Sequence, residues 1–384
     1  MEIIENTEID KDTVSSKELE SLFSKKYNLL AETAVTLKKT YINKLSVSKS
    51  MNIAVRLLDN SIEVYRLDKS SLSKVCRLSG HQQSLTEVVF STKEDHLLYS
   101  SGDGGVKLWD TRTSGLCVQE YKDEERQPHS YTCMDVSCSG RVICAGTETE
   151  QNDAYLVFWD QRKAEPLGGY WNSHTEDITQ VKFHTDKSET LASGSLDGII
   201  NIYNIEEGTE DDALQYTLNV DHAVEKLTWL DHCRLSCATQ YNDLQIWDTT
   251  TADKLKHYDR EKICRSIKRS RADECHVADA YLGADGRPVV LAGSVAGDGG
   301  VLRSVRVSTK SNKLEPLTNF AHNKQLVRCA AYDKQRDILV TTGESGLIDV
   351  WGGVTDGSDE PDEEAVPKKL HKSLRLSDKR HKPY

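Results

Sequence analysis

The sequence is poor in the features that mark secreted and membrane proteins. It holds 10 cysteines in 384 residues, too few for a disulfide scaffold, and its N-terminus is acidic with no apolar run behind it. We therefore expect the thiols to stay reduced. No stretch approaches the roughly 18 consecutive apolar residues of a membrane span. These absences predict a soluble chain that is not secreted and has no membrane partner.

Positive charge and proline are also scarce. The 49 basic and 61 acidic residues give a net charge of −12, which excludes nucleic-acid binding through bulk positive charge. With 7 prolines, long proline-rich linkers are excluded as well. Any basic site must therefore be local.

Sequence motifs for catalysis are missing. There is no GxxxxGK phosphate loop, no HExxH zinc pair and no GxSxG nucleophile elbow. Cys133, Cys138 and Cys144, and likewise Cys233 and Cys237, lack the two-residue gap of zinc knuckles, so we interpret them as buried small side chains. The sequence predicts a protein that is not an enzyme and that needs no metal and no other cofactor.

A repeat is present instead. Strand-like runs end in an aromatic residue at a regular spacing, and several follow Asp-Gly or Gly-Gly, the dipeptides of tight hairpins. Because the last interval is about twice the others, with Ser304 in place of an aromatic residue, we infer seven units over residues 41–351. The aromatic residues are Tyr65, Trp109, Trp159, Tyr203, Trp247 and Trp351, separated by 44, 50, 44, 44 and 104 residues.

Two dipeptides identify the unit. Gly80-His81 opens the second unit and Trp109-Asp110 closes it. A repeat of this length with G-H near its start and W-D near its end is the signature of a four-stranded propeller blade. The sequence therefore resembles the WD-repeat family. The resemblance implies an all-β fold, a single seven-bladed β-propeller. The residues outside the repeat predict a short N-terminal helix and a disordered, charged C-terminal tail.

The repeat also predicts the domain boundaries. We expect the propeller at residues 34–351, an N-terminal extension at 1–33 and the tail at 352–384. Closing the ring needs a strand from the other end of the chain at the seam, and we expect residues 34–38 to supply it. The blades are predicted near 41–79, 85–121, 130–171, 178–218, 223–258, 276–317 and 326–351.

Hydrogen-bonded residues inside the blades are a further implication of the resemblance. In the family, a His, a strand Ser or Thr, a turn Asp and a strand Trp bond to one another. Since an unpaired buried N–H costs about 1–3 kcal/mol, we interpret such residues as structural. In this sequence they are His81, Ser100, Asp103 and Trp109 in the second blade, His174, Ser193, Asp197 and Tyr203 in the fourth, and His322, Thr341 and Trp351 in the seventh.

Three blades depart from the pattern. The fifth shortens its turn, the seventh has Ser345 where the Asp belongs, and the sixth lacks both the G-H and the aromatic residue. We expect these blades to be looser. The sixth is preceded by a basic run, which predicts a loop or an outer strand at Arg260, Lys262, Arg265, Lys268, Arg269 and Arg271.

Both ends of the chain lie outside the predicted ring. Ser15 to Glu18 form a capping box ahead of an apolar stripe, which predicts a short helix that packs on the propeller or docks a partner. The tail is acidic and then basic, and such charge blocks favour disorder. Its basic part predicts a nuclear import signal, with weak RNA contact as the alternative. The signal comprises Lys368, Lys369, Lys379, Arg380 and Lys382.

The predicted function is a protein-interaction scaffold. Acidic inserts at Glu148 to Asp153 and Glu206 to Asp212 would attract basic partners. The third unit resembles one branch of the family, which implies a link to ribosome assembly, with ribosomal proteins or assembly factors as partners. We expect the nucleus or nucleolus as the location, with the cytoplasm as the alternative.

Two other functions stay open. Arg112 and Arg162 each end a W-D-x-R box, and the first of these boxes resembles that of propellers that bind the adaptor of cullin-RING ubiquitin ligases. The resemblance thus implies a substrate receptor as the alternative. A propeller enzyme is the second alternative, because a fold alone does not exclude catalysis.

Overall fold

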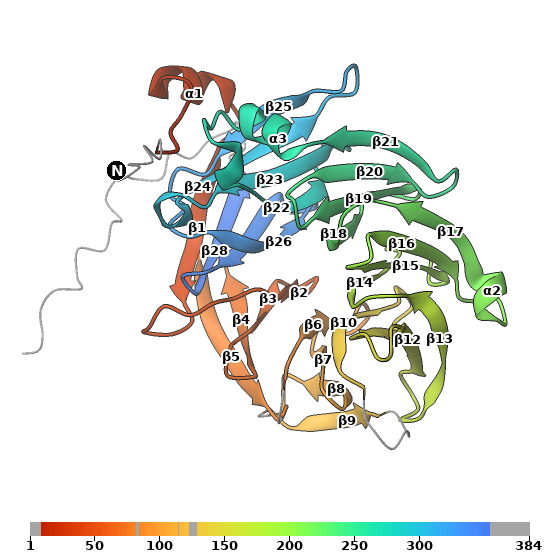
Figure 1. Ribbon diagram of the computed structural model, residues 1–384. Coiled ribbons are helices and arrows are strands. Elements are labelled where there is room, and N and C mark those ends of the chain that lie inside the picture. The colour runs from red at the N-terminus through yellow and green to blue at the C-terminus, as the bar shows by residue number, and fades with distance from the viewer. Residues whose placement is uncertain (1–8, 82–83, 114, 123–128, 354–384) are drawn as a thin grey trace, which may run out of the picture. The chain divides into compact units, whose positions relative to one another are not determined.

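The computed structural model describes residues 9–81, 84–113, 115–122 and 129–353. Within them, seven four-stranded antiparallel sheets follow one another around a ring, each with one strand at the centre (Figure 1). The predicted seven-bladed β-propeller is confirmed. The tail predicted at 352–384, with its import signal, lies outside the described residues apart from Gly352 and Gly353, which end the last strand.

Six blades are simple meanders that run from an inner strand to an outer one, and the seventh takes its outer strand, β1, from the N-terminal part of the chain. Blade 1 comprises β2 (Leu45–Val47), β3 (Asn52–Arg56), β4 (Ser61–Asp68) and β5 (Ser71–Ser79), and blade 2 comprises β6 (Glu87–Phe90), β7 (Leu97–Gly102), β8 (Gly105–Asp110) and β9 (Cys117–Tyr121). Blade 3 comprises β10 (Tyr131–Val136), β11 (Val142–Thr147), β12 (Ala154–Asp160) and β13 (Pro166–His174), and blade 4 comprises β14 (Ile178–Phe183), β15 (Thr190–Ser195), β16 (Ile199–Asn204) and β17 (Leu214–Asn219). Blades 5 to 7 are β18 (Val224–Trp229), β19 (Arg234–Thr239), β20 (Leu244–Asp248) and β21 (Asp253–Tyr258); β22 (Cys275–Leu282), β23 (Pro288–Ser294), β24 (Val301–Val307) and β25 (Leu314–Asn319); and β26 (Val327–Asp333), β27 (Ile338–Gly343), β28 (Leu347–Gly353) and β1 (Tyr27–Ala34).

Burial of both faces of each sheet explains the composition of the strands. In β16, Ile200 and Ile202 pack with residues of blade 5, whereas Tyr203 packs with Phe158 of blade 3. Alternate side chains of a strand point to opposite faces, so both sets are apolar when a blade lies between two others. The turn before β16 has Gly198 at φ 77°, a conformation that glycine adopts without strain.

The strand that closes the ring lies earlier than predicted. β1 pairs antiparallel with β28, from Tyr27 opposite Gly353 to Ala34 opposite Leu347, so the prediction of a closing strand at 34–38 is wrong. Ala31 is buried against Ile348 and Val350 of β28, but Leu37 is fully exposed. The physical reason is distance, because residues 35–44 are needed to carry the chain from the outer edge of blade 7 to the centre at β2.

The described residues also form three short α-helices and two 3-10 turns, η1 (Ala272–Glu274) and η2 (Gly297–Gly299). α1 (Ser16–Leu22) begins at Ser15, whose hydroxyl accepts from the Glu18 N–H, and α2 (Glu210–Ala213) is capped by Thr209. The basic run is predicted to be a loop or an outer strand. That prediction is wrong for Arg260, Lys262 and Arg265, because Asp259 caps the helix α3 (Arg260–Ser266) there, whereas Lys268, Arg269 and Arg271 lie in a loop. No described helix is long and apolar enough to cross a membrane.

The N-terminal helix packs on the propeller. Leu19 and Phe23 are buried in one apolar cluster with residues of blades 5 and 6 and with Ile263 of α3. Phe23 is completely shielded from solvent. Of the two roles predicted for this helix, the described residues thus show packing on the ring.

Candidate interaction surfaces

In blade 4, three of the four predicted residues bond to one another. His174 contacts Ser193 Oγ through Nε2 at 2.8 Å and Asp197 through Nδ1 at 3.1 Å. Tyr203 is buried beside them at the Trp position, and burial raises its pKa to about 12. These groups satisfy one another inside the blade and leave little of their chemistry for a ligand.

Blade 2 holds the same set without its carboxylate. Ser100 Oγ lies 2.7 Å from His81 Nε2 and accepts from Trp109 Nε1 at 2.8 Å, and burial lowers the pKa of His81 to about 4. Asp103, expected in this set, instead accepts from Ser130 of blade 3 at 2.7 Å. The prediction for Asp103 is wrong because of the spacing: Asp103 follows Ser100 by three residues, whereas Asp197 follows Ser193 by four.

In blade 7, the prediction that His322 belongs to the hydrogen-bonded set is wrong. Trp351 Nε1 donates to Thr341 at 2.9 Å, but His322 is exposed. The interior is filled by Gln325, which donates to Asp349 at 2.9 Å. The Gln325 amide is fully satisfied in this position, because it also donates to the Leu347 carbonyl at 3.0 Å and accepts from the Leu347 N–H at 3.3 Å.

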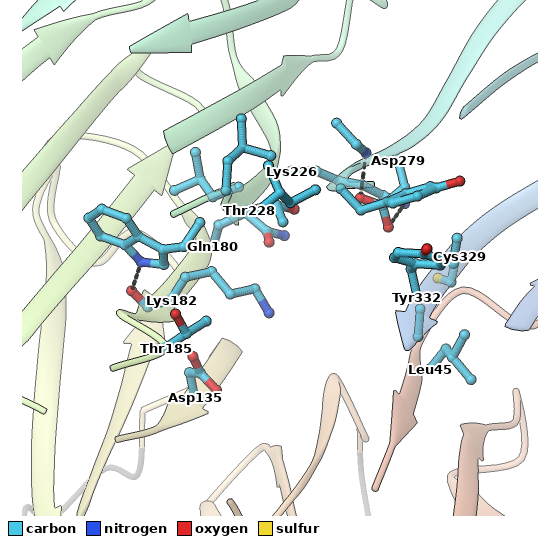
Figure 2. Close-up of a pocket in the computed structure, with 18 of the residues that line it drawn as sticks. Leu45, Asp135, Gln180, Lys182, Thr185, Lys226, Thr228, Asp279, Cys329 and Tyr332 are labelled. Carbon is cyan, nitrogen blue, oxygen red and sulfur yellow. Dashed lines mark hydrogen bonds and ion pairs between the residues drawn. The ribbon is translucent and has the colours of Figure 1, made fainter. Parts of the chain in front are cut away.

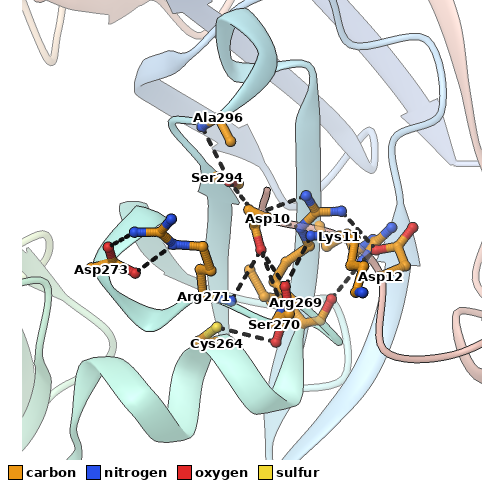
Figure 3. Close-up of polar contacts among 12 residues, drawn as sticks. Asp10, Lys11, Asp12, Cys264, Arg269, Ser270, Arg271, Asp273, Ser294 and Ala296 are labelled. Atoms are coloured by element: carbon orange, nitrogen blue, oxygen red, sulfur yellow. Dashed lines mark hydrogen bonds and ion pairs between the residues drawn. The ribbon is translucent and has the colours of Figure 1, made fainter. Parts of the chain in front are cut away.

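Blade 6 has lost the set altogether. Blade 2 presents Trp109 to the preceding blade, whereas blade 6 presents Val290, Ala292 and Val305 to blade 5. The N-terminal segment fills the gap with charge, as Figure 3 shows. Asp10 accepts from Arg269 Nε at 2.8 Å, and Asp12 accepts from Arg303 Nη1 at 2.7 Å.

This blade 6 network is buried. The side chains of Arg269 and Arg303 are 9% and 4% exposed. Burial by itself would raise the pKa of Asp10, but hydrogen bonds from Ser294, Arg269 and the Arg271 backbone outweigh it and hold the pKa below its ordinary value. The pKa of Asp12 is held low in the same way by Arg303 and Arg269. Sequence reasoning missed the network because each carboxylate is separated from its arginine partners by 257 residues or more.

The centre of the ring is a hollow of about 580 Å³ lined by the inner strands (Figure 2). Its lining includes both acidic and basic side chains. Lys44 pairs with Glu87 at 2.6 Å and Lys226 lies 4.0 Å from Asp279. Asp135 accepts two backbone N–H groups, and burial raises its pKa. Among the described residues, no three His, Cys, Asp or Glu side chains are grouped as a metal site.

The two W-D-x-R arginines lie on one rim. Each follows the third strand of its blade, and the side chains of Arg112 and Arg162 are 66% and 64% exposed. Both bind the Asp of their own box through two nitrogens, with Nη2 to carboxylate distances of 2.7 Å. The hydrogen bonds from Arg112 lower the pKa of Asp110 to about 2. The guanidinium planes are therefore held in place yet open to a partner.

The two acidic inserts lie on opposite rims. Residues 148–153 join the second and third strands of blade 3, whereas residues 205–213 join the third and fourth strands of blade 4. These connections leave opposite ends of a meander. Glu150 binds His129 at 3.0 Å. In the other insert, Glu206, Glu207, Asp211 and Asp212 have no Lys, Arg or His nitrogen within 4.0 Å in the part of the chain that the structure describes.

The ring of seven blades and its His–Ser–Trp contacts define a WD-repeat β-propeller. The family model "WD domain, G-beta repeat" matches residues 72–110 and 166–204, so these two stretches carry the repeat that the sequence predicted. It is similar to WD repeat-containing protein 89 homolog of Dictyostelium discoideum, at 26% identity over 81% of this chain and 82% of that protein.

Two other similarities cover only half of the chain or concern only the fold. WD repeat-containing protein GTS1 of Arabidopsis thaliana is 28% identical over 51% of this chain and 50% of its own length. A chain in the crystal structure of the mitotic checkpoint complex superposes with a TM-score of 0.62 at 16% identity, covering 86% of this chain and 95% of that one. At that identity the superposition shows the fold alone.

Proposed function

We propose that this WD-repeat propeller is a non-enzymatic scaffold for basic proteins in the nucleus, with ribosomal proteins and assembly factors as its partners. WD-repeat propellers are in general protein-interaction platforms. The observation that supports the basic partner is the insert at 206–212, where four exposed carboxylates have no cation beside them in the described residues. Unpaired surface charge of one sign attracts the opposite charge over about 8 Å at physiological salt.

The test is affinity capture from nuclear extract with quantitative mass spectrometry. The wild-type chain is compared with a charge reversal, Glu206→Lys, Glu207→Lys, Asp211→Lys and Asp212→Lys. We expect basic ribosomal proteins to be enriched by the wild type and reduced in the variant, while the melting temperature is unchanged because the four side chains are exposed. Equal capture by both proteins would remove this rim from consideration.

A second function is supported by the exposed arginines. Arg112 and Arg162 present fixed guanidinium groups on neighbouring blades, which suits the adaptor of a cullin-RING ubiquitin ligase. The double variant Arg112→Ala, Arg162→Ala should then lose the adaptor from the captured set without losing the ribosomal proteins. If no adaptor is captured by the wild type, the ligase role is rejected.

Location is tested separately. The tail lysines and arginines predict nuclear import, so replacing Lys368, Lys369, Lys379, Arg380 and Lys382 by Ala should move a fluorescent fusion into the cytoplasm. An unchanged nuclear signal would contradict the import role.

A further inference from the structure

An apolar groove lies on the outer side of the ring, where blades 3 and 4 meet. It runs between β13 and residues 205–208, and its volume is about 260 Å³. Its apolar walls are Val142, Phe158, Leu167, Tyr170 and Ile205, with Glu207 at one side. Hollows that hold whole small molecules usually measure roughly 300–1,000 Å³, so this groove has the size for one or two side chains.

The wall that carries the acidic residues is fixed in place. The Glu210 carboxylate accepts the backbone N–H of Trp171 at 2.7 Å, that of Asn172 at 3.1 Å and the Ser173 hydroxyl at 3.2 Å. These bonds join α2 of blade 4 to the outer strand of blade 3. The groove is thus built by two blades, and α2, which follows its acidic side, is held to β13.

The opposite wall is the first part of the outer strand β13, which carries no charged side chain. Exposed edge strands commonly carry charged side chains that prevent pairing with other chains, but Pro166 to Trp171 contain none. Leu167 is 57% exposed and Trp171 is 44% exposed. Exposed apolar side chains next to a groove mark contact sites for other proteins.

Charge decides which kind of protein fits. Glu207 lines the groove, and Glu206, Asp211 and Asp212 are exposed on the same insert. Within the described residues, the carboxylate of Asp212 accepts from the Thr209 hydroxyl at 2.7 Å, a neutral partner that leaves the negative charge in place. Apolar walls beside uncompensated carboxylates suit a segment in which an apolar residue is flanked by lysine or arginine.

We propose that this groove binds an extended segment of a basic protein, with a leucine-sized side chain between Leu167 and Ile205 and flanking cations facing the 206–212 insert. This inference rests on the proposed scaffold function and names where on the ring the basic partner binds. It requires both the apolar anchor and the charge, whereas the scaffold proposal requires only the charge.

The experiment measures fluorescence anisotropy of a labelled, lysine-rich peptide with one central leucine, added to the full chain. The matched probe has serine in place of that leucine. We expect the leucine peptide to bind about tenfold more tightly or better, because one apolar side chain leaves water. Leu167→Ser should remove most of that difference. The melting temperature should stay unchanged, because Leu167 is largely exposed.

Two sets of charge variants separate the acidic insert from acidity in general. Glu206→Gln, Glu207→Gln, Asp211→Asn and Asp212→Asn together should weaken both peptides roughly threefold to tenfold at low salt. The control set is Glu148→Gln, Glu150→Gln and Asp153→Asn on the opposite rim, which should leave both affinities unchanged.

The outcomes distinguish the two proposals. Equal binding of the leucine and serine peptides overturns the groove, even if capture of basic proteins from extract still depends on the insert. A leucine preference that survives Leu167→Ser places the anchor elsewhere and also overturns it. If neither peptide binds and capture ignores the charge reversal, both proposals fail.

Discussion

Blades 4 and 6 reach the same four-stranded geometry by different chemistry. Blade 4 is held by His174, Ser193 and Asp197, which lie within one repeat. Blade 6 has none of these and is held by Arg269 and Arg303, whose carboxylate partners come from the first residues of the chain. The comparison teaches that the interior of a blade needs polar groups that satisfy one another, and that the identity of those groups is secondary.

The two solutions differ in what they depend on. The blade 4 set is local, so it forms when the blade forms. The blade 6 network closes only when residues 10–12 return to the ring, and it requires ionised carboxylates. Blade 6 is therefore more sensitive than blade 4 to truncation and to acid, although Arg269 and Arg303 are both buried.

The largest expected effect comes from removing residues 1–26, which keeps the closing strand β1 but deletes the partners of blade 6. The deletion exposes the apolar site of Phe23 and leaves Arg269 and Arg303 without Asp10 and Asp12. We expect a loss of roughly 5–10 kcal/mol of unfolding free energy, measured by urea denaturation. A truncated chain as stable as the full one would show that blade 6 does not use the network.

The second prediction concerns the local set. Trp109→Ala should cost about 3–5 kcal/mol by opening a buried cavity. Trp109→Phe should cost less, because one aromatic ring still fills most of the site although the bond to Ser100 is lost. Both are measured by urea denaturation. If Phe is as damaging as Ala, the hydrogen bond rather than the packing holds blade 2.

The third prediction concerns the pH dependence of the blade 6 network, which distinguishes it from the local set of blade 4. The folded pKa values of Asp10 and Asp12 lie below the ordinary value of 3.8, so their contribution to stability is present above that value and is lost as pH falls through the folded pKa values. Asp10→Asn should cost roughly 2–4 kcal/mol at neutral pH. The variant should also lose less stability than the wild type between about pH 5 and pH 3. Parallel pH curves of unfolding free energy would contradict this.

The smallest expected effect has the opposite sign and lies in blade 7. Burial raises the pKa of Asp349 to about 7, so the stability associated with its neutral form is present at acid pH and is lost as pH rises through about 7. Asp349→Asn should therefore raise the melting temperature at about pH 8 and change it little at about pH 5.

Asp337 supplies the matched control for that substitution. Burial by itself would raise the pKa of Asp337, but hydrogen bonds from Tyr27, Lys25 and Tyr332 hold it below the ordinary value. Asp337→Asn should accordingly lower the melting temperature at about pH 8. A rise for both variants would mean that removal of surface charge, and not burial of Asp349, is responsible.

Much of the fold could be predicted because its signals are local. The spacing of aromatic residues and the tight turns mark each blade independently, and seven such marks define a ring. The same local signals predicted the contacts of Ser100 with His81 and Trp109. They failed for Asp103, which follows Ser100 by one residue too few, and for His322, whose interior position Gln325 occupies.

The candidate surfaces were predictable only in part. The acidic inserts and the W-D-x-R arginines are visible in the sequence, and loops that join strands lie on the rims. The groove was not foreseen, since it needs Leu167 of one blade beside Ile205 of the next, joined by Glu210. No spacing rule relates those positions.

The sequence by itself determined the class of this protein, because each repeat encodes its own strands and turns within about 44 residues. The tertiary structure decided how the ring is closed, how blade 6 is held and where a partner would find an apolar groove. The physical reason is that these features depend on contacts between residues far apart in the chain, such as Asp10 and Arg269. Such contacts exist only after the loops between them have closed.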